Sequence, residues 1–122
     1  GNLNVSRFGP RLAGAGGFIN ISQNARKVVF VGTFTSGGLS LEIGDGRLRI
    51  VQEGRNRKFV PAVEQITFSG QRARETGHET IYVTERAVFR IGDEGLELNL
   101  FGLVTGIDLV EHRLFRRVVG LG

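Results

Sequence analysis

The composition describes one small, basic domain. The chain has 122 residues, fewer than the ~150 of a typical domain, so a single domain over residues 1–122 is expected. Its 40% apolar and 23% charged residues are ordinary globular values and exclude a disordered tail. The absence of cysteine excludes disulfides, a thiolate nucleophile and cysteine-based metal sites. A net charge of +4 favours an anionic partner only weakly, since 12 acidic residues are interspersed.

Two further absences set the expected compartment and the nature of the chain. No apolar run reaches the ~18 residues that a membrane span needs, and no signal peptide opens the sequence. A cytoplasmic location without membrane contact is therefore expected. The chain begins at Gly1 and contains no methionine, which predicts a processed or excised segment of a longer protein.

The first third of the chain predicts two strands and a helix. Residues 2–6 alternate apolar and polar side chains, a pattern typical of a short, half-buried strand. Residues 18–25 place Phe18, Ile21 and Ala25 on one helical face. Residues 28–34 are a nearly continuous β-branched and aromatic run, which predicts a strand buried on both faces of a sheet.

The strongest local signal is a β-hairpin in the middle of the chain. Residues 39–43 and 47–50 both alternate apolar and polar side chains, and Gly44, Asp45 and Gly46 lie between them. An Asp-Gly pair suits the tight turn, which needs positive φ. A basic loop is expected at residues 54–58.

The remaining elements complete a strand-rich α/β fold. A short helix is expected over residues 69–77, with Ser69 as its N-cap and Gly77 just past its end. Strands are expected at residues 80–84, 87–91 and 96–100. A closing helix is expected from Asp108, with Glu111 completing a capping box. Together these elements predict a mixed sheet with a hairpin and short helices.

A glycine-rich loop before the first helix is the strongest candidate for chemistry. Gly14, Gly16, Gly17 and Phe18 lead directly into the helix. Glycine permits close backbone approach to a ligand, and free N–H groups at a helix start attract negative charge. Such a loop could hold a phosphate or stabilise an oxyanion. It lacks both the dinucleotide-binding and the Walker pattern, so a plain turn between strand and helix remains an alternative.

Other polar residues carry weaker signals. A desolvated glutamate could act as acid, base or nucleophile, but no spacing pairs two of them and surface or salt-bridge roles are the alternative. The same holds for both histidines, which are expected to be exposed. These candidates are Glu64, Glu85, Glu97, Glu111, His78 and His112.

A basic cluster offers a different class of function. Its members are Arg47, Arg49, Arg55, Arg57 and Lys58. Such a cluster could bind RNA or another polyanion, and Phe59 beside it could stack on a base. The other nine aromatic residues suit a core, and a solvated face remains the alternative for the cluster.

Four ordered blocks resemble one protein family. The run G-P-R-L-A-G-A-G-G-F-I-N-I-S-Q-N-A (residues 9–25) resembles the second half of class I coenzyme A transferases, of the acetate, propionate and 3-ketoacid type. Further matches are K-V-V-F-V-G-T-F, K-F-V-P-A-V-E-Q-I-T-F-S-G and Y-V-T-E-R-A-V-F, in that order. Asn20 stands where some relatives have Asp. The similarity runs to about His112 and fades after Arg113.

The resemblance implies a role within a larger enzyme. Family members attack an acyl-CoA thioester with a glutamate, forming an acyl-glutamyl anhydride and then a glutamyl-CoA thioester. No glutamate here occupies that motif, so the nucleophile is expected upstream and this chain alone is expected to be inactive. The loop of Gly14, Gly16, Gly17 and Phe18 carries over as the oxyanion and CoA-thioester loop, with Asn20 on the substrate side.

The most favoured hypothesis is thus a CoA-transferase fragment, the C-terminal part of the beta-type half in an open α/β domain. Its expected partners are an acyl-CoA, a short-chain carboxylate and the first half or alpha-type subunit of the enzyme, in a homo-oligomer. Coenzyme A would be a substrate, with no cofactor or metal, in ketone-body or short-chain fatty-acid metabolism. Nucleic acid is not expected as a partner. The alternatives are the basic polyanion-binding module and a structural module without a ligand.

Overall fold

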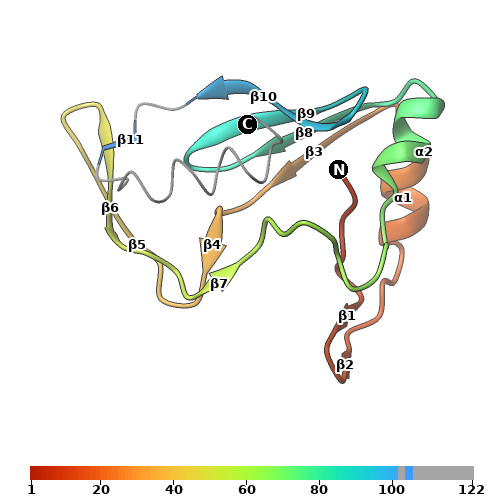
Figure 1. Ribbon diagram of the computed structural model, residues 1–122, viewed down its shortest axis with the longest axis horizontal. Helices are drawn as coiled ribbons and strands as arrows, with labels where there is room; N and C mark the ends of the chain where they lie inside the picture. The colour runs from red at the N-terminus through yellow and green to blue at the C-terminus, as the bar shows by residue number, and fades with distance from the viewer. Residues whose placement is uncertain (102–103, 106–122) are drawn as a thin grey trace.

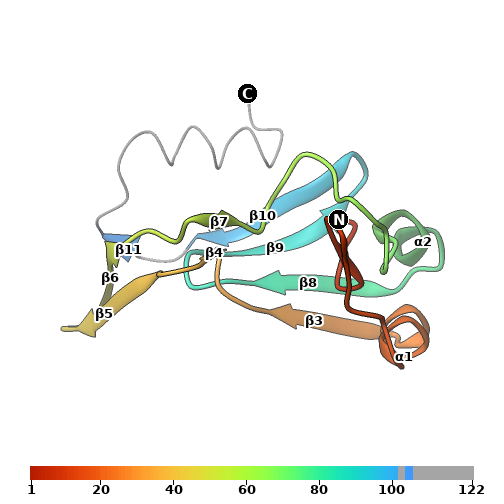
Figure 2. The same ribbon diagram turned by 90° about the horizontal axis from the view of Figure 1, so that it is seen from below.

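A mixed four-stranded sheet forms the centre of the fold. The computed structural model describes residues 1–101 and 104–105. The strands β3 (Lys27–Val31), β8 (Glu79–Val83), β9 (Ala87–Gly92) and β10 (Gly95–Phe101) lie in the order β10-β9-β8-β3. β3 runs parallel to β8, whereas β8, β9 and β10 form an antiparallel meander (Figure 2). The expected combination of parallel and hairpin strands is confirmed.

The predicted hairpin is present at one end of that sheet. Strands β5 (Ser40–Gly44) and β6 (Arg47–Gln52) pair antiparallel around a turn in which Asp45 has φ 53° and Gly46 has φ 70°. Both values lie in the left-handed region that this two-residue turn requires. β11 (Val104–Thr105) adds to β6 in parallel. Figure 1 shows this small sheet at the opposite end of the molecule from the helices.

Two short helices lie at the other end of the four-stranded sheet within residues 1–101. The helix α1 (Phe18–Asn24) follows the glycine loop, and α2 (Gly70–Glu75) precedes β8 (Figure 1). Ser69 caps α2 by accepting a hydrogen bond from the Arg72 N–H at 3.1 Å, and Gly77 ends it with φ +70°, both as predicted. Neither helix has the length and apolar character needed to cross a membrane.

Two pairs of very short strands complete the described part. β1 (Arg7–Phe8) pairs with β2 (Arg11–Leu12) in a small hairpin, and β4 (Thr35–Ser36) pairs with β7 (Asn56–Arg57). β7 lies inside the stretch predicted to be a plain basic loop. The β1–β2 hairpin projects away from the sheet and leads directly into the glycine loop (Figure 1).

Aromatic side chains build the core. Phe34, Tyr82, Ala87 and Phe89 form a buried cluster. Phe59 joins it by stacking on Phe34, with ring centroids 4.7 Å apart. The expectation that the aromatic residues serve the core is confirmed for these residues, whereas Phe8 is 54% exposed.

Two predicted strands differ from the structure. Residues 2–6 form no strand, only a single bridge between Leu3 and Phe68. The Asn4 side chain accepts hydrogen bonds from the N–H groups of Ser6 and Arg7, both at 3.1 Å, and so bends the chain out of the extended conformation.

The second difference concerns β3, which was predicted to be buried on both faces. Within the described residues it is an edge strand, paired on one side only. Its side chains alternate between half-buried and exposed, and Val31 is 78% exposed. The continuous apolar run therefore leaves a face of the sheet uncovered in this part of the chain.

Candidate functional site

The glycine loop is the candidate site, and local hydrogen bonds fold it into the start of α1. The Phe18 N–H donates to the Ala15 carbonyl at 3.0 Å, and the Ile21 N–H donates to the Gly17 carbonyl at 3.0 Å. Gly17 occupies the N-cap position, where no side chain caps the helix and no acidic residue lies in the first turn. The first turn is thus left open to an external acceptor.

The loop is also open in space. Gly14 and Gly16 have φ of +76° and +53°, and a Cβ atom at either position would meet nothing within 4 Å. Among the described residues, the N–H groups of Gly16 and Gly17 donate no hydrogen bond. These donors can therefore serve an oxygen supplied by a ligand.

The two other predicted loop residues lie on opposite sides. The Phe18 ring is half-buried and contacts Phe30, with centroids 5.9 Å apart, so it anchors the loop to the sheet. Asn20 is exposed in the first turn of α1.

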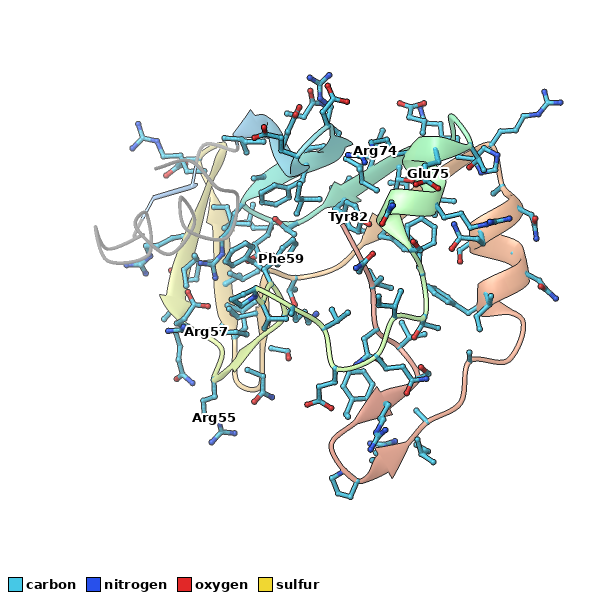
Figure 3. All side chains as sticks on the ribbon, turned by 45° about the vertical axis from the view of Figure 1, so that its right-hand side comes forward. Arg55, Arg57, Phe59, Arg74, Glu75 and Tyr82 are labelled. Atoms are coloured by element: carbon cyan, nitrogen blue, oxygen red, sulfur yellow. The ribbon has the colours of Figure 1, made fainter. Side chains whose placement is uncertain are left out.

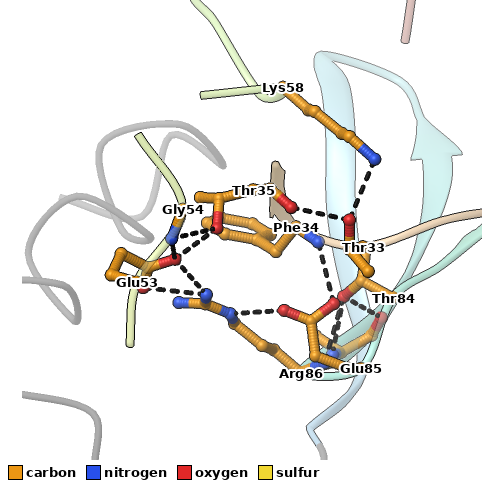
Figure 4. A network of polar contacts seen from close by, with 10 residues as sticks. Thr33, Phe34, Thr35, Glu53, Gly54, Lys58, Thr84, Glu85 and Arg86 are labelled. Atoms are coloured by element: carbon orange, nitrogen blue, oxygen red, sulfur yellow. Dashed lines mark hydrogen bonds and ion pairs between the residues drawn. The ribbon is translucent and has the colours of Figure 1, made fainter. Parts of the chain in front are cut away.

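A network of charged side chains joins three segments elsewhere in the fold (Figure 4). The Arg86 side chain is 3% exposed. Its guanidinium donates to both carboxylate oxygens of Glu53, at 2.7 and 2.8 Å, and to Glu85 at 2.8 Å. Glu85 also accepts the Phe34 N–H at 2.8 Å, and the guanidinium lies 4.8 Å from the Phe34 ring centre.

This network explains why Glu85 is not free for catalysis. A salt bridge was one of the roles expected for Glu85, but neither Arg86 as its partner nor Glu53 as the second carboxylate on Arg86 was predicted. Glu53 lies at the end of the β5–β6 hairpin and Arg86 in the turn between β8 and β9, so only the fold brings them together. One buried guanidinium holds both carboxylates in place, so the network links the three segments and serves the structure rather than catalysis.

The other predicted acid and base candidates are scattered. Glu64 accepts a hydrogen bond from the Gly9 N–H at 2.7 Å, and Glu97 pairs with Arg90 on the exposed face of β9 and β10 at 3.3 Å. Glu111 and His112 lie outside the described residues. In residues 1–101 and 104–105, no three His, Asp or Glu side chains gather as metal ligands.

His78 was predicted to be exposed, which is wrong. Its backbone N–H donates to the Ala73 carbonyl at 2.9 Å, which folds the residue against the end of α2. The side chain is half-buried, and its Nδ1 atom has no hydrogen-bond partner in the described residues.

Two members of the basic cluster contact other side chains of the fold. Lys58 donates to the Thr33 hydroxyl at 2.9 Å, and Arg49 pairs with Glu42 across the hairpin. Figure 3 shows Arg55 pointing away from the strands, whereas Phe59 lies among them. Because Phe59 stacks inside the core, it cannot serve as an exposed platform for a base.

The chain is similar to part of several CoA-transferases, the class of protein that its motifs resemble. Over 109 residues it is 48% identical to the acetate CoA-transferase YdiF of Escherichia coli O157:H7 and to that of strain K12. It is also 48% identical, over 114 residues, to the caffeate CoA-transferase of Acetobacterium woodii. Each match covers 89% of this chain but only 20% or 21% of the relative, so the chain spans about a fifth of their length. No protein-family model matches the chain.

Solved structures agree with the sequence matches. The apoenzyme of the acyl-CoA transferase YdiF from E. coli O157:H7 superposes with a TM-score of 0.82 at 46% identity, over 91% of this chain and 21% of that one. The thioester complex of the same transferase with CoA gives 0.84 at 46% identity, over 95% and 22%. The predicted fold class, a strand-rich mixed α/β part of a CoA-transferase, is confirmed.

Proposed function

We propose that this chain is a single, partial domain of a CoA-transferase and supplies the loop that binds the thioester carbonyl of acyl-CoA. The observation that carries the proposal is the glycine loop before α1. It presents the N–H groups of Gly16 and Gly17 without acceptors among the described residues, and it has open space beside Gly14 and Gly16. It is also supported by the resemblance, which implies that these glycines and Phe18 would lie at the thioester of coenzyme A.

The chemistry explains why such a loop is needed. A carboxylate that attacks the thioester carbonyl forms a new C–O bond, and the carbonyl oxygen takes up negative charge. The C–S bond then breaks, the CoA thiolate leaves, and an anhydride remains. Backbone donors aimed at that oxygen stabilise the charge without any reorganisation. Since α1 has only seven residues, its dipole is a minor contribution and the N–H groups themselves carry the effect.

The remaining roles in the proposal concern Asn20 and the rest of the enzyme. The nucleophilic glutamate would come from the upstream part, so this chain alone would be inactive. Asn20 would face the substrate side of the loop. The acceptor would be a short-chain carboxylate, coenzyme A would be a substrate rather than a cofactor, and the complete enzyme would be a cytoplasmic homo-oligomer.

Exposed apolar side chains support a partner at the sheet edge. Ile19 and Ile21 of α1 and Val29 and Val31 of β3 are 47–78% exposed. A parallel edge strand with an uncovered apolar face is rare in a complete α/β domain. We propose that the first half of the enzyme covers this edge.

The experiment uses a chimera in which this chain replaces the matching fifth of the E. coli acetate CoA-transferase. Gly16→Val places a branched side chain at φ +53°, in the space proposed for substrate, and should lower turnover about 10²-fold or more. Gly77→Val is the matched control, because Gly77 also has positive φ and open space around its Cβ but ends α2 away from the loop. Equal turnover in the two variants, with both folded, would remove the loop from the mechanism.

A further inference from the structure

The β1–β2 hairpin leads directly into the glycine loop but is too short to be stable by itself. Each strand has two residues, and all four are exposed. An isolated two-stranded hairpin is marginally stable even when it is longer. The placement of the loop must therefore come from contacts with another part of the chain.

The first such contact reaches the hairpin turn. The Glu64 carboxylate accepts a hydrogen bond from the Gly9 N–H at 2.7 Å, although the two residues are 55 positions apart. Hydrogen bonds to a charged acceptor are about twice as strong as those between neutral groups. Glu64 thus fixes the tip of the hairpin.

The second contact lies at the base of the hairpin, where Thr67 is buried. Its hydroxyl accepts the Val5 N–H at 3.1 Å and forms a hydrogen bond with the Ser6 hydroxyl at 2.8 Å. The Ser6 carbonyl in turn accepts the Ala13 N–H at 2.9 Å. Ala13 directly precedes Gly14, so Thr67 is two hydrogen bonds away from the start of the glycine loop.

The third contact lies on the far side of the loop. The Gln23 side chain of α1 forms two hydrogen bonds with the backbone of Ser69: it accepts the N–H at 3.1 Å and donates to the carbonyl at 3.4 Å. The aromatic rings add a parallel route, since Phe30 contacts both Phe18, at 5.9 Å, and Phe68, at 5.1 Å. The same short segment therefore holds the chain before and after the loop.

We infer that residues 64–69, here called the brace, position the glycine loop for catalysis. Glu64 and Thr67 are positioning residues, acting through Gly9 and Ser6 without touching substrate. This inference rests on the proposed function of the loop. A displacement of about 1 Å from such a support costs up to about 10²-fold in rate, because the donors then miss the oxygen as it gains charge.

The test is steady-state kinetics of Thr67→Val in the chimera of this chain with the E. coli acetate CoA-transferase. Valine keeps the shape of threonine but removes the hydroxyl, and should lower kcat about 10-fold or more while KM changes by less than about threefold. Thr80→Val is the matched control, since Thr80 is equally buried but its hydroxyl has no hydrogen-bond partner in the described residues. Thr67→Ser keeps the hydroxyl and should restore kcat.

A second variant tests the positioning role of the brace if Thr67→Val fails to fold. Glu64→Ala changes an exposed side chain and should lower kcat about 5-fold or more. Its control is Glu75→Ala, which removes an exposed glutamate bonded only to Gln71 of the same helix among the described contacts. Normal kcat in Glu64→Ala and in folded Thr67→Val, while Gly16→Val is inactive, would overturn the brace but leave the proposed function standing. Normal kcat in Gly16→Val would overturn the proposed function, and the brace with it.

Discussion

Replacing Arg86 by methionine should destabilise this fold more than any exposed charge substitution. Methionine preserves much of the length and the apolar contacts of arginine but removes its charge. Two carboxylates then lose their counter-charge, and one of them, Glu85, has a side chain that is only 8% exposed. The stacking of the guanidinium on Phe34 is lost as well.

The magnitude follows from burial and geometry. At the observed N–O distances of 2.7 and 2.8 Å, each ion pair is worth about 6 kcal/mol at an effective dielectric constant of about 20, most of which offsets desolvation. Removing one partner of a buried pair nevertheless costs about 3–5 kcal/mol, because the other charge stays buried. A domain of this size has a free energy of unfolding of about 6–18 kcal/mol, so the loss is a large fraction of the whole.

Urea unfolding of the 122-residue chain, followed by circular dichroism, measures the effect. With a slope of about 1.5 kcal/mol per M, the midpoint should fall by about 2–3 M. Arg90→Met is the matched control, since Arg90 pairs with Glu97 at 3.3 Å on an exposed face, where such pairs contribute less than about 1 kcal/mol. Adding Glu53→Gln and Glu85→Gln to Arg86→Met should recover much of the loss, because neither of these two carboxylates is then left charged beside the methionine.

Equal midpoints for Arg86→Met and Arg90→Met would refute this reasoning. Failure of the triple variant to recover stability would show that the geometry of the hydrogen bonds matters more than the buried charge.

Three further predictions concern pH, activity and charge. Burial raises the pKa of the Tyr82 hydroxyl above its ordinary value. The stability that this shift contributes is therefore complete below pH of about 10 and is lost as the pH rises further. Tyr82 is the only tyrosine, so the absorbance of its phenolate should appear together with alkaline unfolding rather than before it. The 122-residue chain should show no turnover when it is incubated with acetyl-CoA and a carboxylate acceptor. After trapping with hydroxylamine, mass spectrometry should find no modified glutamate. An adduct on any glutamate would mean that the nucleophile lies in this chain. Binding of the chain to RNA should be weak and should fall steeply with salt, and a sub-micromolar, sequence-selective complex at physiological salt would favour the polyanion-binding alternative instead.

The elements that were predicted correctly are those with local causes. The Asp45-Gly46 turn, the Ser69 cap and the Gly77 stop each depend on a few neighbouring residues, and all three are where the sequence placed them. The strand predicted at residues 2–6 failed because Asn4 bonds to the backbone two and three residues ahead, and alternation of apolar residues does not register that competition.

The same distinction between local and long-range causes applies to the candidate site. The glycine loop was recognisable because its residues are adjacent in the chain, and the ordered motifs gave the family. The residues that hold the chain before this loop were not recognisable, since the contacts of Glu64 and Thr67 with it span more than fifty positions. Arg86 lies in the Y-V-T-E-R-A-V-F block, but its contact with Glu53 exists only once β8, β9 and the hairpin are folded together.

The parallel pairing of β3 with β8 has a consequence for the order in which this molecule folds. Lys27 pairs with Glu79, so a long stretch of chain must be closed before this contact can form, whereas the β5–β6 hairpin and the β8–β9–β10 meander need only near neighbours. The contacts that hold the glycine loop span equally long distances. We therefore expect the loop to reach its working conformation late in folding, after the local hairpins have formed.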